Sequence, residues 1–146
     1  MKLLRMSLAL IALTVLSACA SGPKYNEVAA TFPRSNAADG RIWFYRPGIA
    51  FGAGIQPGVI LNGTRIGESV PGGFFYVDRP AGNYEVLLST EVDRKVTFTL
   101  APGQERYIKM TVGLGVIVYR VYPELVDEGV GRGEIVDTSY IGGQKK

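Results

Sequence analysis

The chain has 146 residues, the length of a single domain, with no histidine and one cysteine, Cys19. These absences exclude Ser-His-Asp and Cys-His catalysis, histidine-bound zinc or iron, and an intrachain disulfide. The formal charge of +3 includes Lys2 and Arg5, and without those two, 14 basic residues face 13 acidic ones. The remaining basic residues are scattered along the chain, so the charge gives no reason to expect a nucleic-acid partner.

Residues 1–18 have the layout of a secretory signal peptide, with a basic start and an apolar run over Met6–Leu16. This run is shorter than the ~20 apolar residues that span a bilayer. Its end, Leu16-Ser17-Ala18-Cys19, resembles the lipobox of bacterial lipoproteins, in which cleavage leaves the cysteine as an acylated N-terminus. The resemblance implies a membrane anchor of acyl chains such as palmitate on Cys19. The residue after Cys19 is Ala20 and not an acidic residue, which resembles the sequence of lipoproteins that are sorted to the outer membrane and face the periplasm. An ordinary signal peptide, with Cys19 as a free thiol, is the alternative.

Residues 19–39 have the composition of a flexible linker, with Ser-Gly-Pro near the start and Pro33-Arg34-Ser35-Asn36 near the end. Glu27–Phe32 has room for one helical turn, but no convincing cap precedes it. As coil, such a segment would place the following domain roughly 25 Å from its lipid on average.

From Arg41 onward the hydrophobic pattern has period two, which predicts strands separated by Gly, Pro and Asn turns. Asn62-Gly63 predicts a tight hairpin, because both residues tolerate positive φ. The run Val116–Tyr122 is apolar enough for a strand covered on both faces. The expected strands are Arg41–Arg46, Val59–Leu61, Thr64–Glu68, Phe74–Asp78, Tyr84–Thr90, Lys95–Leu100, Tyr107–Val112 and Val116–Tyr122.

The mature chain contains no helix-period segment of ten or more residues. Short strands at this spacing favour an all-β fold, an antiparallel β-sandwich of seven to eight strands rather than a barrel, over residues 40–141. Glu134–Asp137 is a candidate last edge strand, and residues 142–146 are expected to be a frayed tail. Gly113-Leu114-Gly115 is expected to be a hairpin turn, because no helix and no Gly-Lys-Ser/Thr follows it.

Three pieces of this region carry a family resemblance: residues 40–47 (GRIWFYRP), 59–67 (VILNGTRIG) and 80–86 (PAGNYEV). In combination they resemble the bacterial family called domain of unknown function 2846. They are also similar to PEGA-type and carboxypeptidase-regulatory-like β-sandwich modules. The resemblance covers about residues 40–122. It implies a small β-sandwich of unknown activity, often on a lipoprotein, and supplies no catalytic residues.

Two features are candidate partner contacts. Trp43 and Tyr45 share the strand face opposite Ile42 and Phe44, and they form either an exposed aromatic strip or a layer covered by neighbouring chain. The glycine-rich loop 48–55, with Phe51 at its centre, is either a docking loop or a connection folded onto the core.

No carboxylate pair stands out for acid–base work, and the acidic tail lacks the spaced ligands of a calcium loop. We therefore expect no enzyme activity, no cofactor and no metal. The expected function is a lipid-anchored module of the cell envelope that binds a protein or glycan partner. The alternative is a structural component that self-associates through an edge strand such as Glu134–Tyr140.

Overall fold

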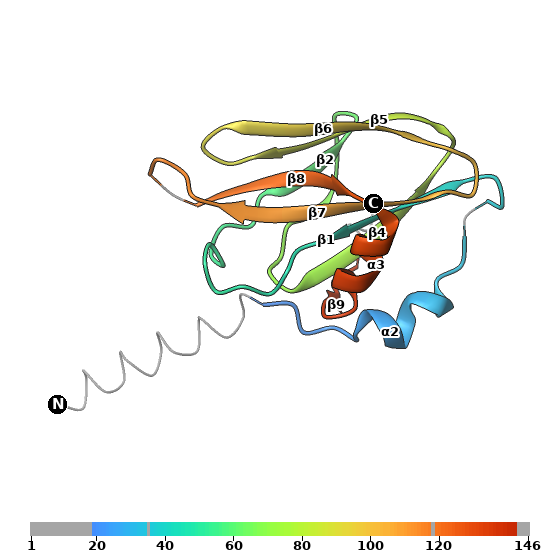
Figure 1. The fold of residues 1–146 in the computed structure, drawn as a ribbon, viewed down its shortest axis with the longest axis horizontal. Helices are drawn as coiled ribbons and strands as arrows, with labels where there is room; N and C mark the ends of the chain where they lie inside the picture. The colour runs from blue at the N-terminus through green and yellow to red at the C-terminus, as the bar shows by residue number, and fades with distance from the viewer. Residues whose placement is uncertain (1–18, 35, 118, 143–146) are drawn as a thin grey trace.

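The computed structural model describes residues 19–34, 36–117 and 119–142 (Figure 1). The predicted signal peptide and residues 143–146 of the predicted tail lie outside the described residues. The elements, in chain order, are α2 (Tyr25–Val28), the 3₁₀ turn η1 (Ala29–Thr31), β1 (Gly40–Tyr45), β2 (Gly58–Leu61), β3 (Thr64–Glu68), β4 (Gly73–Arg79), β5 (Gly82–Ser89), β6 (Asp93–Leu100), β7 (Glu105–Gly113), β8 (Arg120–Val126), α3 (Glu128–Ile135) and β9 (Ser139–Tyr140).

Two sheets form the predicted β-sandwich. The five-stranded sheet has the order β8-β7-β1-β4-β9, and the four-stranded sheet has the order β3-β2-β5-β6. Most neighbouring strands are antiparallel, as expected, but β1 pairs with β7 in parallel and β4 pairs with β9 in parallel. Figure 1 shows the two sheets as stacked layers, with α2 and α3 lying against the five-stranded one.

The core between the sheets comes from the alternating positions that the sequence indicated. Ile42 and Phe44 of β1 point into this layer, where Phe44 stacks on Phe75 with 4.9 Å between ring centroids. The Asn62-Gly63 hairpin is confirmed, with φ of 46° and 81°, which is the left-handed region that a two-residue turn needs. The other buried apolar residues of this core are Val59, Leu61, Ile66, Val86, Leu88, Phe98, Leu100, Ile108, Met110 and Val121.

The prediction that residues 19–39 are a flexible linker is wrong. The stretch from Tyr25 to Phe32 packs on the outer face of the five-stranded sheet, where Tyr25 and Phe32 contact Trp43. Backbone hydrogen bonds pin it to the region around β9: Tyr25 N–H donates to Thr138 O at 3.2 Å, and Tyr140 N–H donates to Pro23 O at 2.8 Å. The segment is ordered because four apolar residues at helical spacing, Tyr25, Val28, Ala29 and Phe32, find an aromatic surface to bury against.

Two predictions for the C-terminal third are also wrong. Val116–Tyr122 is not a buried strand: β8 begins only at Arg120, and Val116 and Ile117 are 86% and 88% exposed. Glu134–Asp137 is not an edge strand, because Glu134 and Ile135 end the helix α3. This helix lies close to β7, since a Cβ at Gly131 would come within 2.3 Å of the Tyr107 ring, so only glycine fits there.

The sheet edge that was predicted to self-associate also differs in the structure. Instead of a strand over 134–140, the sheet ends in the two-residue β9, which pairs with β4 on one side. On its other side Ser139 forms a bridge with Lys24. The edge is therefore short and bordered by the N-terminal segment, which removes the observation on which the self-association hypothesis depended.

Candidate functional site

Four loops meet at one end of the sandwich, and the described chain begins there. β1 and β7 are parallel, and β4 and β8 run opposite to them. The last residues of β1 and β7 therefore lie at the same end of the sheet as the first residues of β4 and β8, namely Tyr45, Gly113, Gly73 and Arg120. In the other sheet, the register of β2 with β3 and β5 places loops 46–57, 69–72 and 90–92 at a single end. In Figure 1 the blue start of the described chain, the teal β1–β2 loop and the orange β7–β8 loop (114–119) lie on the same side.

Cys19 is exposed and lies at this end, which we call the Cys19 end. Its neighbour Ala20 is held by a hydrogen bond from its N–H to Pro71 O at 3.0 Å. The residue after Pro71, Gly72, approaches Gly48 so closely that a Cβ on Gly48 would lie 3.4 Å from the Gly72 Cα. The anchor cysteine predicted from sequence is thus next to the loop that carries Phe51, without a flexible tether between them.

The Cys19 end gathers most of the exposed large apolar side chains. Among the described residues seven are exposed, and only Val130, on α3, lies elsewhere. We call the other six the apolar tip: Ile49, Phe51, Val92, Leu114, Val116 and Ile117. A folded domain rarely concentrates such residues on one end without a partner for them.

Arg46 holds the loop that presents Phe51. Its side chain is fully buried at the end of β1, and its guanidinium donates to Gly52 O at 2.7 Å, Ile55 O at 2.6 Å and Ser69 O at 2.8 Å. Burial lowers the pKa of Arg46 to about 10, so the group remains protonated at neutral pH. These bonds tie loop 46–57 to loop 69–72 and fix the backbone that follows Phe51.

Phe51 itself is 68% exposed, so of the two alternatives for loop 48–55 the structure favours an outward-facing loop over one folded onto the core. Its ring lies 6.1 Å from the Tyr119 ring, which links it to the β7–β8 loop. A shallow hollow of about 350 Å³ lies between the two loops. It is lined by Ile49, Phe51, Val112, Gly113, Leu114 and Tyr119.

The β7–β8 loop is held by one carboxylate. Glu91, in the β5–β6 loop, accepts from Val116 N–H at 3.0 Å and from Ile117 N–H at 2.6 Å. Arg120 Nε donates to the same carboxylate at 2.9 Å. Two backbone N–H groups of this loop are therefore satisfied while its apolar side chains stay exposed.

Trp43 and Tyr45 are not an exposed aromatic strip. They are 2% and 0% exposed, because the stretch from Tyr25 to Phe32 and the helix α3 cover that face of the sheet. Of the two alternatives for these residues, the covered layer is what the structure shows. Neither can contact a partner in this structure, and the hypothesis that they do is withdrawn.

The Tyr45 hydroxyl donates to Glu134 of α3 at 2.6 Å, and Lys109 donates to the same carboxylate at 2.9 Å. The Tyr45 bond is the main cause that lowers the pKa of Glu134 below its ordinary value of 4.5. A carboxyl group with a lowered folded-state pKa stabilises the fold above its unfolded-state pKa, and this contribution is lost as pH falls through the folded-state value.

We therefore expect Tyr45→Phe to lower the free energy of unfolding by about 1 kcal/mol at pH 7, and by progressively less below pH 4.5. Urea unfolding at a series of pH values measures this difference. Tyr84→Phe is the matched control, because the Tyr84 hydroxyl donates to the carbonyl of Pro80, which does not titrate. A loss that is independent of pH in both variants would contradict the assignment.

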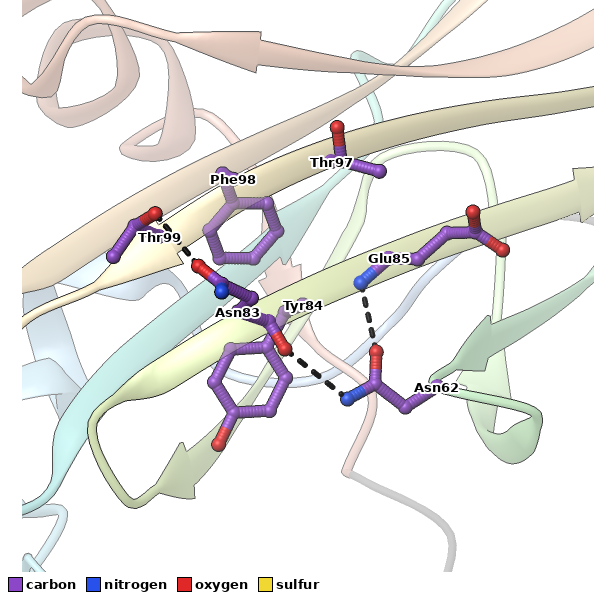
Figure 2. A pocket seen from close by; sticks show the side chains of 7 residues that line it. All are labelled: Asn62, Asn83, Tyr84, Glu85, Thr97, Phe98 and Thr99. Atoms are coloured by element: carbon purple, nitrogen blue, oxygen red, sulfur yellow. Dashed lines mark hydrogen bonds between the residues drawn. The ribbon is translucent and has the colours of Figure 1, made fainter.

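A second hollow, of about 440 Å³, lies on the outer face of the four-stranded sheet (Figure 2). Its polar side chains largely bond to the protein itself: Asn62 accepts from Glu85 N–H at 2.8 Å, and Thr99 donates to Asn83 at 2.9 Å. The neighbouring Glu85 pairs with Lys95 at 3.0 Å. These contacts describe a solvated sheet face, and Tyr84 and Phe98 pack against the core rather than outward.

Within the described ranges no three His, Cys, Asp or Glu side chains are placed to hold a metal ion. No helix among the described residues is long and apolar enough to cross a membrane. The acidic residues of the C-terminal segment are partly engaged in ion pairs, since Glu128 pairs with Arg132 and Glu134 pairs with Lys109.

The fold and the site define a two-sheet β-sandwich with one apolar end next to a single cysteine. The chain belongs to the family described as "Protein of unknown function (DUF2846)", whose model matches residues 36–121. The match includes loops 46–57 and 69–72, whereas Cys19, α2 and α3 lie outside it. No curated protein and no solved structure matches the chain. The similarity to PEGA-type modules therefore stays an expectation from the sequence.

Proposed function

We propose that this chain is a lipid-anchored protein of the bacterial cell envelope, attached through Cys19 to the outer membrane and facing the periplasm. Its β-sandwich acts as a non-enzymatic module that binds an envelope protein or a glycan. The lipobox Leu16-Ser17-Ala18-Cys19 supplies the chemistry of the anchor. The observation that carries the proposal is the place of Cys19, which is exposed at the apolar end of the domain.

The non-enzymatic part of the proposal is supported by buried or engaged charged groups that serve the domain's own structure. Arg41 and Asp78 form a buried pair at 2.7 Å, and Arg41 also lies over the Tyr76 ring at 4.1 Å. Glu91 and Glu134 each fix a loop or a helix, as described above. A general acid or base needs a carboxyl or amino group left available to a substrate. Loss of a measurable turnover on replacing one Asp or Glu in a folded variant would contradict the non-enzymatic part.

We expect Cys19→Ala to move the protein from the membrane fraction to the soluble fraction of the envelope, because no acyl chain can be attached. Immunoblotting of separated membranes measures the distribution. Metabolic labelling with an alkyne analogue of palmitate measures acylation directly, and it should be lost in the same variant. The full-length wild-type chain should label and sediment with outer membranes.

The matched control is Ser21→Ala, which changes a neighbouring small residue without touching the acylation site. A Cys19→Ala protein that still sediments with membranes and still incorporates the palmitate analogue would contradict the anchor. A wild-type protein found in the soluble fraction, with its thiol reactive to maleimide, would support the ordinary signal peptide instead.

A further inference from the structure

We infer that the apolar tip contacts the phospholipid bilayer that holds the acylated Cys19, so that the domain lies on the membrane by its Cys19 end. This inference rests on the proposed lipid anchor and goes beyond it, because an anchor alone leaves the orientation of the domain open.

The first support is the distribution of exposed apolar surface. Six of the seven exposed large apolar side chains of the described residues form the apolar tip. Leu114, Val116 and Ile117 are each more than four-fifths exposed, at 84%, 86% and 88%. Side chains of this kind in three separate loops stay in water at a free-energy cost unless another surface covers them.

The second support is the short path from the anchor to the tip. The Ala20 N–H bonds to Pro71 O at 3.0 Å, and a Cβ on Gly73 would lie 3.3 Å from the Ala20 Cβ. Loop 69–72 in turn contacts the Phe51 loop through Gly72 and Gly48. Acyl chains on Cys19 enter the bilayer at this point, and the ordered segment after Cys19 leaves no length of coil to move the tip away.

The third support is chemical. Backbone amides taken to a membrane interface cost free energy unless they are hydrogen-bonded. In the β7–β8 loop the N–H groups of Val116 and Ile117 already donate to Glu91, whose carboxylate also accepts from Arg120. Phe51 and Tyr119 add the aromatic rings that are typical of membrane–water interfaces. The bilayer is therefore the surface that fits this end.

The test uses the mature protein acylated on Cys19, purified in detergent and reconstituted into vesicles of phosphatidylethanolamine and phosphatidylglycerol. One vesicle set carries bromine on the acyl chains, which quenches tryptophan fluorescence by contact. Trp43 is the only native tryptophan and is 2% exposed under the N-terminal segment, so the wild type supplies an unquenched background. Phe51→Trp and Ile117→Trp each place a second tryptophan on the tip, in separate loops.

We expect both tip variants to lose most of the added emission in brominated vesicles, with a shift to shorter wavelength in unbrominated ones. Val130→Trp is the matched control, because Val130 is 49% exposed but lies on α3 and not on the tip. Its neighbour Gly131 packs on Tyr107, near the start of β7, whereas the Cys19 end is at Gly113, where β7 ends. The emission of this control variant should be equal in the two vesicle sets. Two variants in independent loops keep the test valid if one of them folds poorly, as judged by circular dichroism.

Flotation of the same vesicles separates the two proposals. Wild-type protein that does not float with vesicles overturns the lipid anchor, and the inference with it. Floating protein whose tip tryptophans are equally bright in both vesicle sets leaves the anchor in place and overturns the inference. In that case, crosslinking between tips would assign the apolar surface to a second copy of the chain.

Discussion

Trp43→Ala is expected to lower the free energy of unfolding by about 3–5 kcal/mol, the loss typical of a large aromatic side chain removed from a packed interior. Trp43 is 2% exposed at the centre of the outer aromatic layer. Its ring lies 5.2 Å from Tyr25 and 5.3 Å from Tyr76. Urea unfolding of the protein lacking its signal segment, followed by circular dichroism, measures the change.

The matched control for this variant is Phe51→Ala, which removes an aromatic ring from a 68% exposed position in the same protein. It should change the free energy of unfolding by less than about 1 kcal/mol. If Trp43→Ala were as mild as Phe51→Ala, the N-terminal segment would not cover the sheet, and the exposed aromatic strip would return as a hypothesis. Protease cleavage near Phe32, accelerated in Trp43→Ala, would support the packed arrangement independently.

Arg46→Met is expected to lower the free energy of unfolding by about 2–4 kcal/mol. Methionine fills much of the same volume but leaves the carbonyls of Gly52, Ile55 and Ser69 without the donor that now serves them. The loss is partly offset because a buried charge is also removed. Urea unfolding measures stability, and limited proteolysis within loop 46–57 measures the local effect.

Arg46→Lys is the informative companion variant. The lysine side chain is shorter than that of arginine, and its ammonium group lacks the planar set of donors by which the guanidinium reaches three carbonyls at once. Its charge is also more easily lost on burial. We expect it to recover only part of the stability, about 1 kcal/mol relative to methionine. Arg65→Met is the control, since Arg65 is half exposed and pairs with Glu68 of the same strand. Full stability of Arg46→Met would show that the loop is held by other contacts.

Much of the sandwich could be predicted because its signals are local. The alternation in β1 placed Ile42 and Phe44 in the core, and Asn62-Gly63 specified its own turn. The parallel pairing of β1 with β7 could not be predicted in this way, because the two strands are separated by some sixty residues and no turn fixes their register.

The wrong predictions for residues 19–39 and for Val116–Tyr122 have one physical cause, which is that contacts with distant residues override local propensity. Tyr25, Val28, Ala29 and Phe32 have helical spacing, but α2 is a single turn, which gains its stability only from the sheet beneath it. Conversely, Val116 and Ile117 have strand propensity, but the backbone N–H groups that would pair with a strand bond to Glu91 instead.

The site was found only in part. Cys19 and Phe51 stood out in the sequence, the first through the lipobox and the second through the absence of charge in its loop. The sequence predicts a turn at Leu114 and a buried strand at Val116 and Ile117, and so it does not place these three residues on the same surface. A run of apolar residues flanked by Gly115 and Arg120 is ambiguous without knowing which loops share an end of the sandwich.

The ordered N-terminal segment also fixes how far the opposite end of the domain lies from Cys19. β7 has nine residues, and at ~3.3 Å per residue it separates the Cys19 end from the opposite turns by ~30 Å. A coil tether would let those turns sample a wide range of distances from the lipid, whereas a segment bonded to Pro71 and Thr138 keeps the distance nearly constant. With the anchor proposed on Cys19, the domain would act as a spacer of fixed length that holds the opposite turns at one distance from the lipid.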